Sequence, residues 1–276
     1  MSHAPAPPRR AGGRATDALR PVELAIDVLK YAEGSVEIAM GDTRVLVAAS
    51  VENRVPGFLS GSGRGWVTAE YAMLPRATAT RSAREVTQGR PSGRTAEIQR
   101  LVGRSLRSVV DLAKLGERTV TVDCDVLQAD AGTRCAAITG AWVATALALG
   151  KIYLAGDVVA WPLADQVAAV SVGVVGGAPL LDLDFSEDQG ADVDMNVVAT
   201  PDGRLVEIQG TGEHRSFSRA ELDQLIDLAL AGIARLGGEQ RAAVSTLLAE
   251  VAELEKKGPR RQAPPKNERG LWKRDR

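Results

Sequence analysis

The pattern that most constrains the fold is a pair of alternating strands followed by an amphipathic helix, and the chain contains it twice. The first pair is predicted at 36–51 around a Gly-Asp turn, with a helix over 95–113. The second is predicted at 196–210 around Pro-Asp-Gly, with a helix from Ser218 that has a capping box. Strands that pair as hairpins between helices favour an α+β fold. The repetition indicates two halves related by duplication.

Two more sheet segments are predicted between these units, at 118–127 and 166–185, with an Ala-rich helix from about 135 to 149. The chain has 276 residues, 45% of them hydrophobic, and can therefore bury a substantial core. We expect a single compact domain made of two halves, flanked by an arm and a tail. The predicted divisions, in chain order, are 1–13, 14–150, 151–250 and 251–276.

Both ends of the chain are expected to be disordered. Residues 1–13 are rich in Pro, Arg and Gly and cannot bury enough apolar surface to fold alone. The segment beyond Glu255 is basic, contains Pro and has no periodic apolar face. This tail is either a solubilising end or a mobile arm that loosely holds a polyanion, and the sequence leaves both open.

Charge and composition limit the possible partners. The formal net charge is −1, so binding of a polyanion would require a local basic patch. The N-terminus lacks the apolar centre of a signal peptide, and no membrane span is expected, so the cytoplasm is the default location. The two cysteines, Cys124 and Cys135, flank one turn and are interpreted as buried packing residues, neither a disulfide nor metal ligands.

The starts of two predicted helices have the composition of an anion site. Gly132, Thr133 and Arg134 end a β-patterned run immediately before the Ala-rich helix. Glycine lets the backbone approach a ligand, the hydroxyl and guanidinium add donors, and the first N–H groups of the helix point the same way. Arg94, in Ser-Gly-Arg-Thr, stands at the start of another predicted helix. The Gly-Thr-Arg segment is also compatible with a simple turn from strand to helix.

A series of basic residues between 76 and 107 consists of arginine alone, which suits bidentate binding of phosphate. Arg76, Arg81 and Arg84 lie in a polar segment that is predicted to be an exposed loop able to follow a nucleic-acid backbone. Three members on the predicted helix are interpreted as facing solvent or another subunit: Arg100, Arg104 and Arg107.

Six carboxylates cluster near the end of the last sheet segment of the centre: Asp182, Asp184, Glu187, Asp188, Asp192 and Asp194. Clustered carboxylates repel one another unless something neutralises them. Mg²⁺ held by one or two carboxylates and by substrate phosphate would do so, while a solvated acidic loop is the alternative. The spacing does not match a Ca²⁺-binding EF-hand loop.

Missing motifs narrow the chemistry. The chain has no GxxxxGK[ST] motif, so nucleotide hydrolysis of the P-loop kind is not supported. It also has no HExxH motif and only two histidines, so a mechanism in which histidine activates water or binds a metal is disfavoured. Phosphorolysis needs neither, because inorganic phosphate is already anionic and must only be bound, oriented and shielded from the phosphodiester it attacks.

Several long segments, in order, resemble bacterial ribonuclease PH: AEGSVEIAMGDTRVL, GWVTAEYAMLPRAT, GRTAEIQRL, DCDVLQADAGTR, AAVSVGV and DMNVVATPDGRLVEIQGT. The resemblance runs from about Arg14 to the helix after Ser218. It implies a duplicated β/α core with mixed sheets and packed helices. It also implies a phosphate-dependent 3′–5′ exoribonuclease that trims tRNA precursors, releases nucleoside diphosphates, runs backwards as a nucleotidyltransferase and takes part in rRNA processing.

The resemblance further implies roles for particular residues. The phosphate site corresponds to Arg94, Gly132, Thr133 and Arg134; the acidic pair needed for activity, with Mg²⁺, corresponds to Asp188 and Asp194; the tRNA grip falls on Arg76, Arg81 and Arg84. Arg94, Arg134 and the two aspartates are thus the expected catalytic residues. A homohexamer built as a trimer of dimers is expected. The rival functions are a non-catalytic RNA-binding scaffold and a hydrolytic nuclease.

Overall fold

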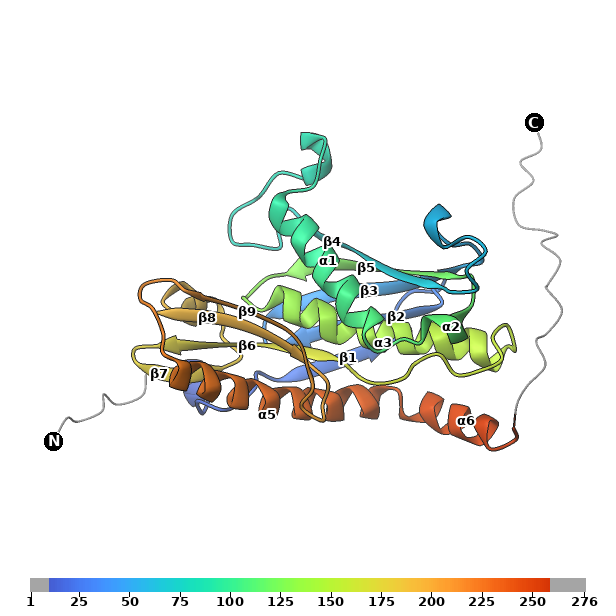
Figure 1. The fold of residues 1–276 in the computed structure, drawn as a ribbon. Helices are drawn as coiled ribbons and strands as arrows, with labels where there is room; N and C mark the ends of the chain where they lie inside the picture. Colours follow the sequence, from blue (N-terminus) through green and yellow to red (C-terminus); the bar gives the residue numbers. More distant parts are fainter. Residues whose placement is uncertain (1–9, 259–276) are drawn as a thin grey trace.

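The computed structural model describes residues 10–258, and its first half is built on a five-stranded sheet (Figure 1). The strands are β1 (Val22–Ile26), β2 (Gly34–Met40), β3 (Thr43–Glu52), β4 (Trp66–Met73) and β5 (Thr119–Gln128). Their order across the sheet is β1-β2-β3-β5-β4. β4 and β5 are parallel and the other pairs antiparallel, so the sheet is mixed.

The second half is built on a four-stranded antiparallel sheet in the order β7-β6-β8-β9. Its strands are β6 (Ala168–Val175), β7 (Ala178–Leu181), β8 (Val193–Ala199) and β9 (Leu205–Gly212). The α-helices are α1 (Gly93–Arg107), α2 (Leu112–Leu115), α3 (Thr133–Leu154), α4 (Phe185–Gln189), α5 (Arg219–Ala243) and α6 (Ser245–Glu255). Short 3-10 turns occupy Ala11–Gly13, Gly57–Leu59 and Glu85–Gln88. The architecture confirms the predicted α+β class, while the duplication of the halves stays a prediction.

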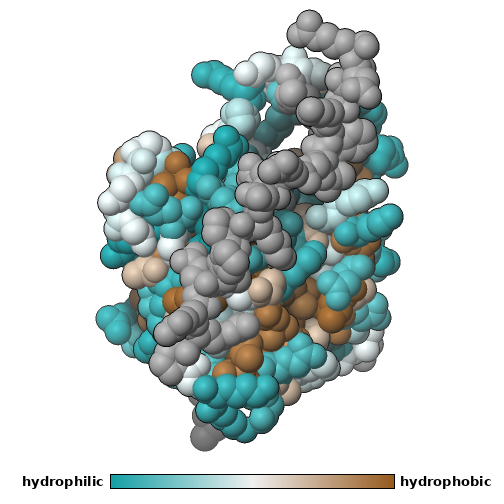
Figure 2. All heavy atoms as spheres, turned by 90° about the vertical axis from the view of Figure 1, so that its right-hand side faces the viewer, coloured by the Kyte–Doolittle hydropathy of each residue, from teal (hydrophilic) through white to brown (hydrophobic). Residues whose placement is uncertain are grey.

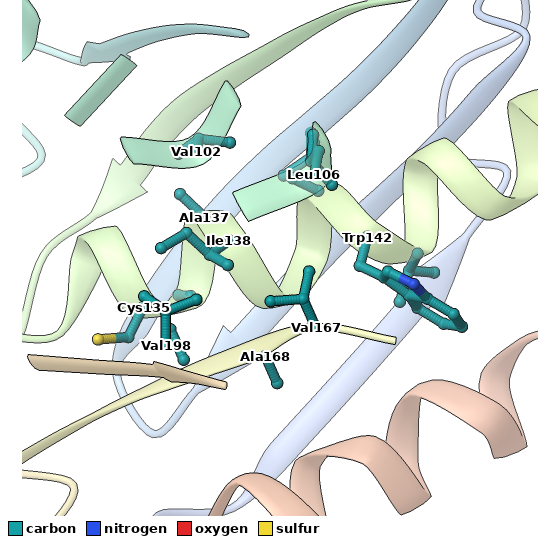
Figure 3. Close-up of a cluster of buried hydrophobic side chains, with 14 of the residues drawn as sticks. Val102, Leu106, Cys135, Ala137, Ile138, Trp142, Val167, Ala168 and Val198 are labelled. Atoms are coloured by element: carbon teal, nitrogen blue, oxygen red, sulfur yellow. The ribbon is translucent and has the colours of Figure 1, made fainter. Parts of the chain in front are cut away.

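Helix α3 forms the centre of the core and packs against strands of both sheets and against α1, α5 and α6 (Figure 3). Its backbone lies very close to β2, where Gly34 has no side chain: a Cβ on Gly34 would lie only 2.1 Å from the carbonyl oxygen of Ala144. By length and composition α3 also resembles a membrane span, which was not predicted. However, 94% of its most apolar window is buried inside the protein, as expected for a core helix.

Both predicted hairpins and the capping box are confirmed. β2 and β3 pair through a turn at Gly41, which has φ of 58°, and β8 pairs with β9. Ser218 and Glu221 form the reciprocal bonds of the box at the start of α5. The helix predicted over 95–113 is wrong at its end: α1 stops at Arg107, and Asp111 caps the separate turn α2. β1 and β4 were not predicted.

The two ends differ from the prediction where the structure describes them. Arg10, assigned to the arm 1–13, is only 5% exposed, because its guanidinium binds Glu187 and backbone carbonyl oxygens. Val251, assigned to the tail 251–276, is buried and belongs to α6. The predictions for 1–9 and 259–276 lie outside the described residues.

The two ends of α3 lie in different surroundings. Seen from the side of the molecule where α6 lies, the surface is mainly hydrophilic, with hydrophobic side chains gathered below its centre (Figure 2). The opposite, N-terminal end of α3 opens into a polar cavity that adjoins both sheets. That cavity is where the predicted site residues converge.

Candidate active site

A cavity of about 290 Å³ lies between the N-terminus of α3, the first turn of α1, the strand β8 and the short helix α4. All six residues predicted to bind phosphate or metal line it: Arg94, Gly132, Thr133, Arg134, Asp188 and Asp194. Their positions span about 100 residues of sequence, so the fold, not local sequence, brings them together. The cavity combines two guanidinium groups with two carboxylates.

The bend before α3 has an unusual backbone that its neighbours hold in place. Ala131 and Gly132 both have left-handed backbones, with φ of 57° and 65°. The Thr43 hydroxyl accepts from the amide of Asp130 at 2.9 Å and donates to the carbonyl of Ala131 at 2.6 Å. Arg20 Nη1 donates to the carbonyl of Asp130, and a Cβ on Gly132 would lie 2.9 Å from Arg20 Nη2. A side chain at position 132 would therefore be disfavoured by both backbone and space.

Thr133 and Arg134 are the first two residues of α3, where free N–H groups and the helix dipole favour an anion. Thr133 is buried, and its Oγ1 accepts a hydrogen bond from the Tyr71 hydroxyl at 2.9 Å. Arg134 Nη1 donates to Oε1 of Gln209 at 2.7 Å, which fixes the guanidinium at the cavity wall. The two side chains are thus oriented by strands of different sheets.

Arg94 approaches the cavity from the other helix. It is the second residue of α1, whose N-cap Ser92 accepts from the amide of Thr95 at 3.1 Å. Its side chain is exposed and makes no hydrogen bond to the described part of the chain. Two helix N-termini, each bearing an arginine, consequently border one cavity.

The two carboxylates of the cavity are held in an environment that opposes their charge. Burial raises the pKa of Asp188. Burial, together with the neighbouring Asp188, raises the pKa of Asp194 to about 6, although Arg134 and Arg94 act in the opposite direction. Asp194 Oδ1 is buried with no hydrogen-bond partner among residues 10–258. A buried carboxylate oxygen without a donor is suited to a cation.

A metal at this position would have few protein ligands. In the part of the chain that the structure describes, no three His, Cys, Asp or Glu side chains are grouped to hold a metal ion. Mg²⁺ commonly binds through one or two carboxylates and takes its other ligands from water and substrate phosphate. Asp188 and Asp194 fit that mode, and a closed, all-protein metal cage is not formed by the described residues.

The rest of the acidic cluster has a different role, which the sequence did not indicate. Asp182 is 1% exposed and binds Arg20 through both carboxylate oxygens. Glu187 accepts from Arg10 at 2.8 Å and from Arg14 at 3.0 Å. Arginines of the N-terminal segment therefore neutralise these carboxylates, so the cluster is neither a single metal site nor a solvated loop.

The predicted RNA grip lies beside the cavity and not within it. Arg76, Arg81 and Arg84 are exposed on the loop that follows β4, and none of their guanidinium groups makes a hydrogen bond or ion pair with another described residue. Met73 and Thr78, from the same strand and loop, line the cavity. The loop thus leads outward from the cavity with its cations facing solvent.

Two of the three helix arginines interpreted as facing solvent or another subunit, Arg104 and Arg107, make contacts within the chain. Arg104 pairs with Glu207 at 2.8 Å, and Arg107 lies over the Trp66 ring at 4.5 Å. Both cysteines are free and buried, as predicted.

Sequence reasoning missed several residues of the site. Asn196 lines the cavity, and its Oδ1 accepts from the Cys135 thiol at 3.2 Å. It is two residues from Asp194 on β8, so both side chains lie on one face of the sheet, and this spacing was a usable signal. Phe185, half exposed, forms an apolar part of the wall. Tyr71 and Gln209 contact the site residues through long-range pairs that no local pattern indicates.

Comparison with known proteins gives consistent results. Residues 18–149 match domain 1 of the 3′ exoribonuclease family, and residues 165–232 match domain 2. Ribonuclease PH of Moorella thermoacetica is 57% identical over 242 residues, which cover 88% of this chain and 97% of that protein.

Solved structures show the same fold. The Archaeoglobus fulgidus exosome with RNA bound to its active site has a chain that is 25% identical, with a TM-score of 0.70 over 84% of this chain and 92% of that one. Rice (Oryza sativa) Rrp46 is 22% identical, with a TM-score of 0.69 over 86% of this chain and 100% of that one. With both family domains matched in order and a relative of such high identity, the chain belongs to the 3′ exoribonuclease family of ribonuclease PH.

Proposed function

We propose that this protein is a phosphate-dependent 3′–5′ exoribonuclease and nucleotidyltransferase whose reaction takes place in the cavity at the start of α3. The observation that carries the proposal is that two arginines at helix N-termini and two partly buried carboxylates line one cavity. Membership of the ribonuclease PH family supports the same activity. Arg94, Thr133 and Arg134 are the proposed phosphate ligands, with Gly132 allowing the backbone to approach.

In this proposal the protein binds and aims the attacking ion. Inorganic phosphate attacks the terminal phosphodiester, the bond from phosphorus to the 3′ oxygen breaks, and the removed nucleotide leaves as a nucleoside diphosphate. The shortened RNA keeps a 3′-hydroxyl. The two guanidinium groups offset the repulsion between the attacking and attacked anions and stabilise charge in the transition state. The reverse reaction adds a nucleotide from a nucleoside diphosphate.

Asp188 and Asp194 are the proposed ligands of Mg²⁺, on the basis of their partial burial, their raised pKa values and the unpaired Oδ1 of Asp194. When bound, the ion would supply positive charge to the scissile phosphate.

The proposed substrates are RNA 3′ ends, with tRNA precursors first and rRNA second, and the proposed setting is the cytoplasm. We also propose a homohexamer built as a trimer of dimers. A relative that is a ribonuclease PH and a structural neighbour with RNA in its active site support RNA as the substrate class. Burial of α3 inside the fold supports a role that does not involve crossing a membrane.

The product of the reaction tests the activity. A tRNA precursor with a short 3′ extension is incubated with the protein and Mg²⁺, with and without inorganic phosphate, and the released nucleotides are identified. Phosphorolysis predicts nucleoside diphosphates that form only when phosphate is present. Nucleoside monophosphates without phosphate would show hydrolysis instead, and RNA binding without shortening would show a scaffold.

Replacing Arg76, Arg81 and Arg84 by alanine is expected to weaken tRNA-precursor binding more than it weakens cleavage of a short oligonucleotide. Their guanidinium groups face solvent beside the cavity, where an RNA backbone could contact them. For each one that pairs with a phosphate, its removal should reduce the slope of log binding constant against log salt concentration by about 0.7–0.9. Binding is measured by titration at several salt concentrations.

The matched control removes three exposed arginines from elsewhere on the surface, Arg54, Arg204 and Arg219. It changes the net charge equally. The proposed RNA-binding role of Arg76, Arg81 and Arg84 would be contradicted if both triple variants lost the same affinity for the tRNA precursor. It would also be contradicted if the variant impaired binding of the precursor and cleavage of the short oligonucleotide equally.

A further inference from the structure

Tyr71 contacts the proposed phosphate site from behind. It lies on β4, its ring is packed in the hydrophobic core, and only 4% of the residue is exposed. Its hydroxyl donates to Thr133 Oγ1 at 2.9 Å. Thr133 lines the cavity and Tyr71 does not, so any influence of Tyr71 on a ligand passes through Thr133.

The hydrogen bond determines what the Thr133 hydroxyl can offer to the cavity. A threonine hydroxyl has one hydrogen to donate and two lone pairs to accept with. When Tyr71 fills one lone pair, the hydrogen of Thr133 remains available for an acceptor. The unprotonated oxygens of inorganic phosphate can accept this hydrogen, so the two hydroxyls and the ion can form a chain of hydrogen bonds that runs from the core to the ligand.

Tyr71 is suited to be the first donor of that chain. Burial raises the pKa of its phenol, with Thr133, Arg94 and Arg134 acting in the opposite direction. The phenol is therefore protonated at the pH of any ordinary assay. A buried tyrosine hydroxyl needs a partner, and within residues 10–258 the Thr133 oxygen is the one this hydroxyl has.

We propose that Tyr71 is a positioning residue for phosphorolysis, which orients the Thr133 hydroxyl so that its hydrogen points at inorganic phosphate. The same arrangement serves the reverse reaction, because the terminal phosphate of a nucleoside diphosphate must occupy the site that the attacking phosphate uses. This inference rests on the proposed phosphate site at Thr133 and Arg134. It adds a residue from β4 to that site.

Tyr71→Phe tests the inference by deleting one oxygen while retaining the ring. The Michaelis constant for phosphate should rise about five- to tenfold, the loss expected for one uncharged hydrogen bond. The Michaelis constant for a short RNA and kcat at saturating phosphate should change less than twofold. In the reverse direction the Michaelis constant for nucleoside diphosphate should rise by a similar factor.

Tyr153→Phe is the matched control. Tyr153 is also buried and lies near the other end of α3, far from the cavity. Thermal unfolding of both variants shows the effect of losing a buried hydroxyl on stability alone. If the two variants lower the melting temperature equally but only Tyr71→Phe raises the Michaelis constant for phosphate, a merely structural role is excluded.

Thr133→Val, alone and combined with Tyr71→Phe, separates the inference from the site on which it rests. If Tyr71 acts through Thr133, the Michaelis constant for phosphate should be no higher in the double variant than in Thr133→Val. Additive effects, or an unchanged constant in Tyr71→Phe while Thr133→Val is impaired, would overturn the role of Tyr71 and leave the phosphate site intact. If the Michaelis constant for phosphate were unchanged in both Thr133→Val and Arg134→Ala, the assignment of the phosphate site itself would be contradicted.

Discussion

Arg134→Ala is expected to reduce phosphate-dependent RNA shortening by about 10²–10³-fold, the loss typical of removing one donor that stabilises a charged transition state. Arg134 stands at the N-terminus of α3, with its guanidinium held by Gln209 and its side chain 16% exposed. It also lowers the pKa of Asp188 and Asp194. Without it, an arriving phosphate would meet two carboxylates and one fewer cation.

The measurement is the initial rate of oligonucleotide shortening over a range of phosphate concentrations. Assembly is followed by light scattering and should not change, since Arg134 faces the cavity. Arg104→Ala is the control, because Arg104 pairs with the nearby Glu207 and lies outside the cavity lining. Full activity in Arg134→Ala would contradict the assignment of the phosphate site.

Asp194→Asn is expected to abolish activity and yet to stabilise the metal-free protein at pH 8. Burial, then Asp188, raises the pKa of Asp194 to about 6 from an ordinary value of 3.8. Because the folded protein binds this proton more tightly than the unfolded chain does, the ionised carboxylate destabilises the fold above pH 6. The penalty is about 3 kcal/mol, and it disappears as the pH falls through 6 towards 4.

Thermal unfolding in the presence of a chelator measures this effect. The melting temperature of Asp194→Asn should exceed that of the wild type by about 5–10 °C at pH 8, and the difference should shrink at pH 4.5. Adding Mg²⁺ should raise the melting temperature of the wild type and not that of the variant.

Asp192→Asn is the matched control, since its carboxylate is near Arg215 and does not line the cavity. It should be no more stable than the wild type. A destabilised Asp194→Asn at pH 8 would contradict the idea that function retains an unfavourable charge here.

The acidic cluster shows what sequence can and cannot predict about this site. Asp188 and Asp194 were identified because the resemblance matched them, but composition alone treats them like Asp182 or Glu187. Only the fold separates the two kinds, because the arginines that neutralise the second kind come from a segment more than 160 residues earlier. Arg10, which also binds Glu187, lies in the part of that segment that has the composition of a disordered arm, so its ordered position was not predicted.

For secondary structure, too, local signals were read correctly from the sequence and long-range contacts were not. Signals that act over a few residues, such as the turn at Gly41 and the capping box at Ser218, are confirmed. The end of α1 was misjudged because Val109 and Val110 continue its apolar spacing, whereas Val110 bridges to Leu163 instead. The strand β4, which supplies Tyr71, was not predicted although its burial alternates along most of its length.

The position of α3 bears on how the protein unfolds. One continuous helix packs against β2 and β3 of the first sheet and against β6 of the second, so melting of either sheet would expose a buried face of α3. We therefore expect the two matched family segments to unfold as one cooperative unit, so that loosening the core around either sheet also disturbs the proposed catalytic groups held by the other.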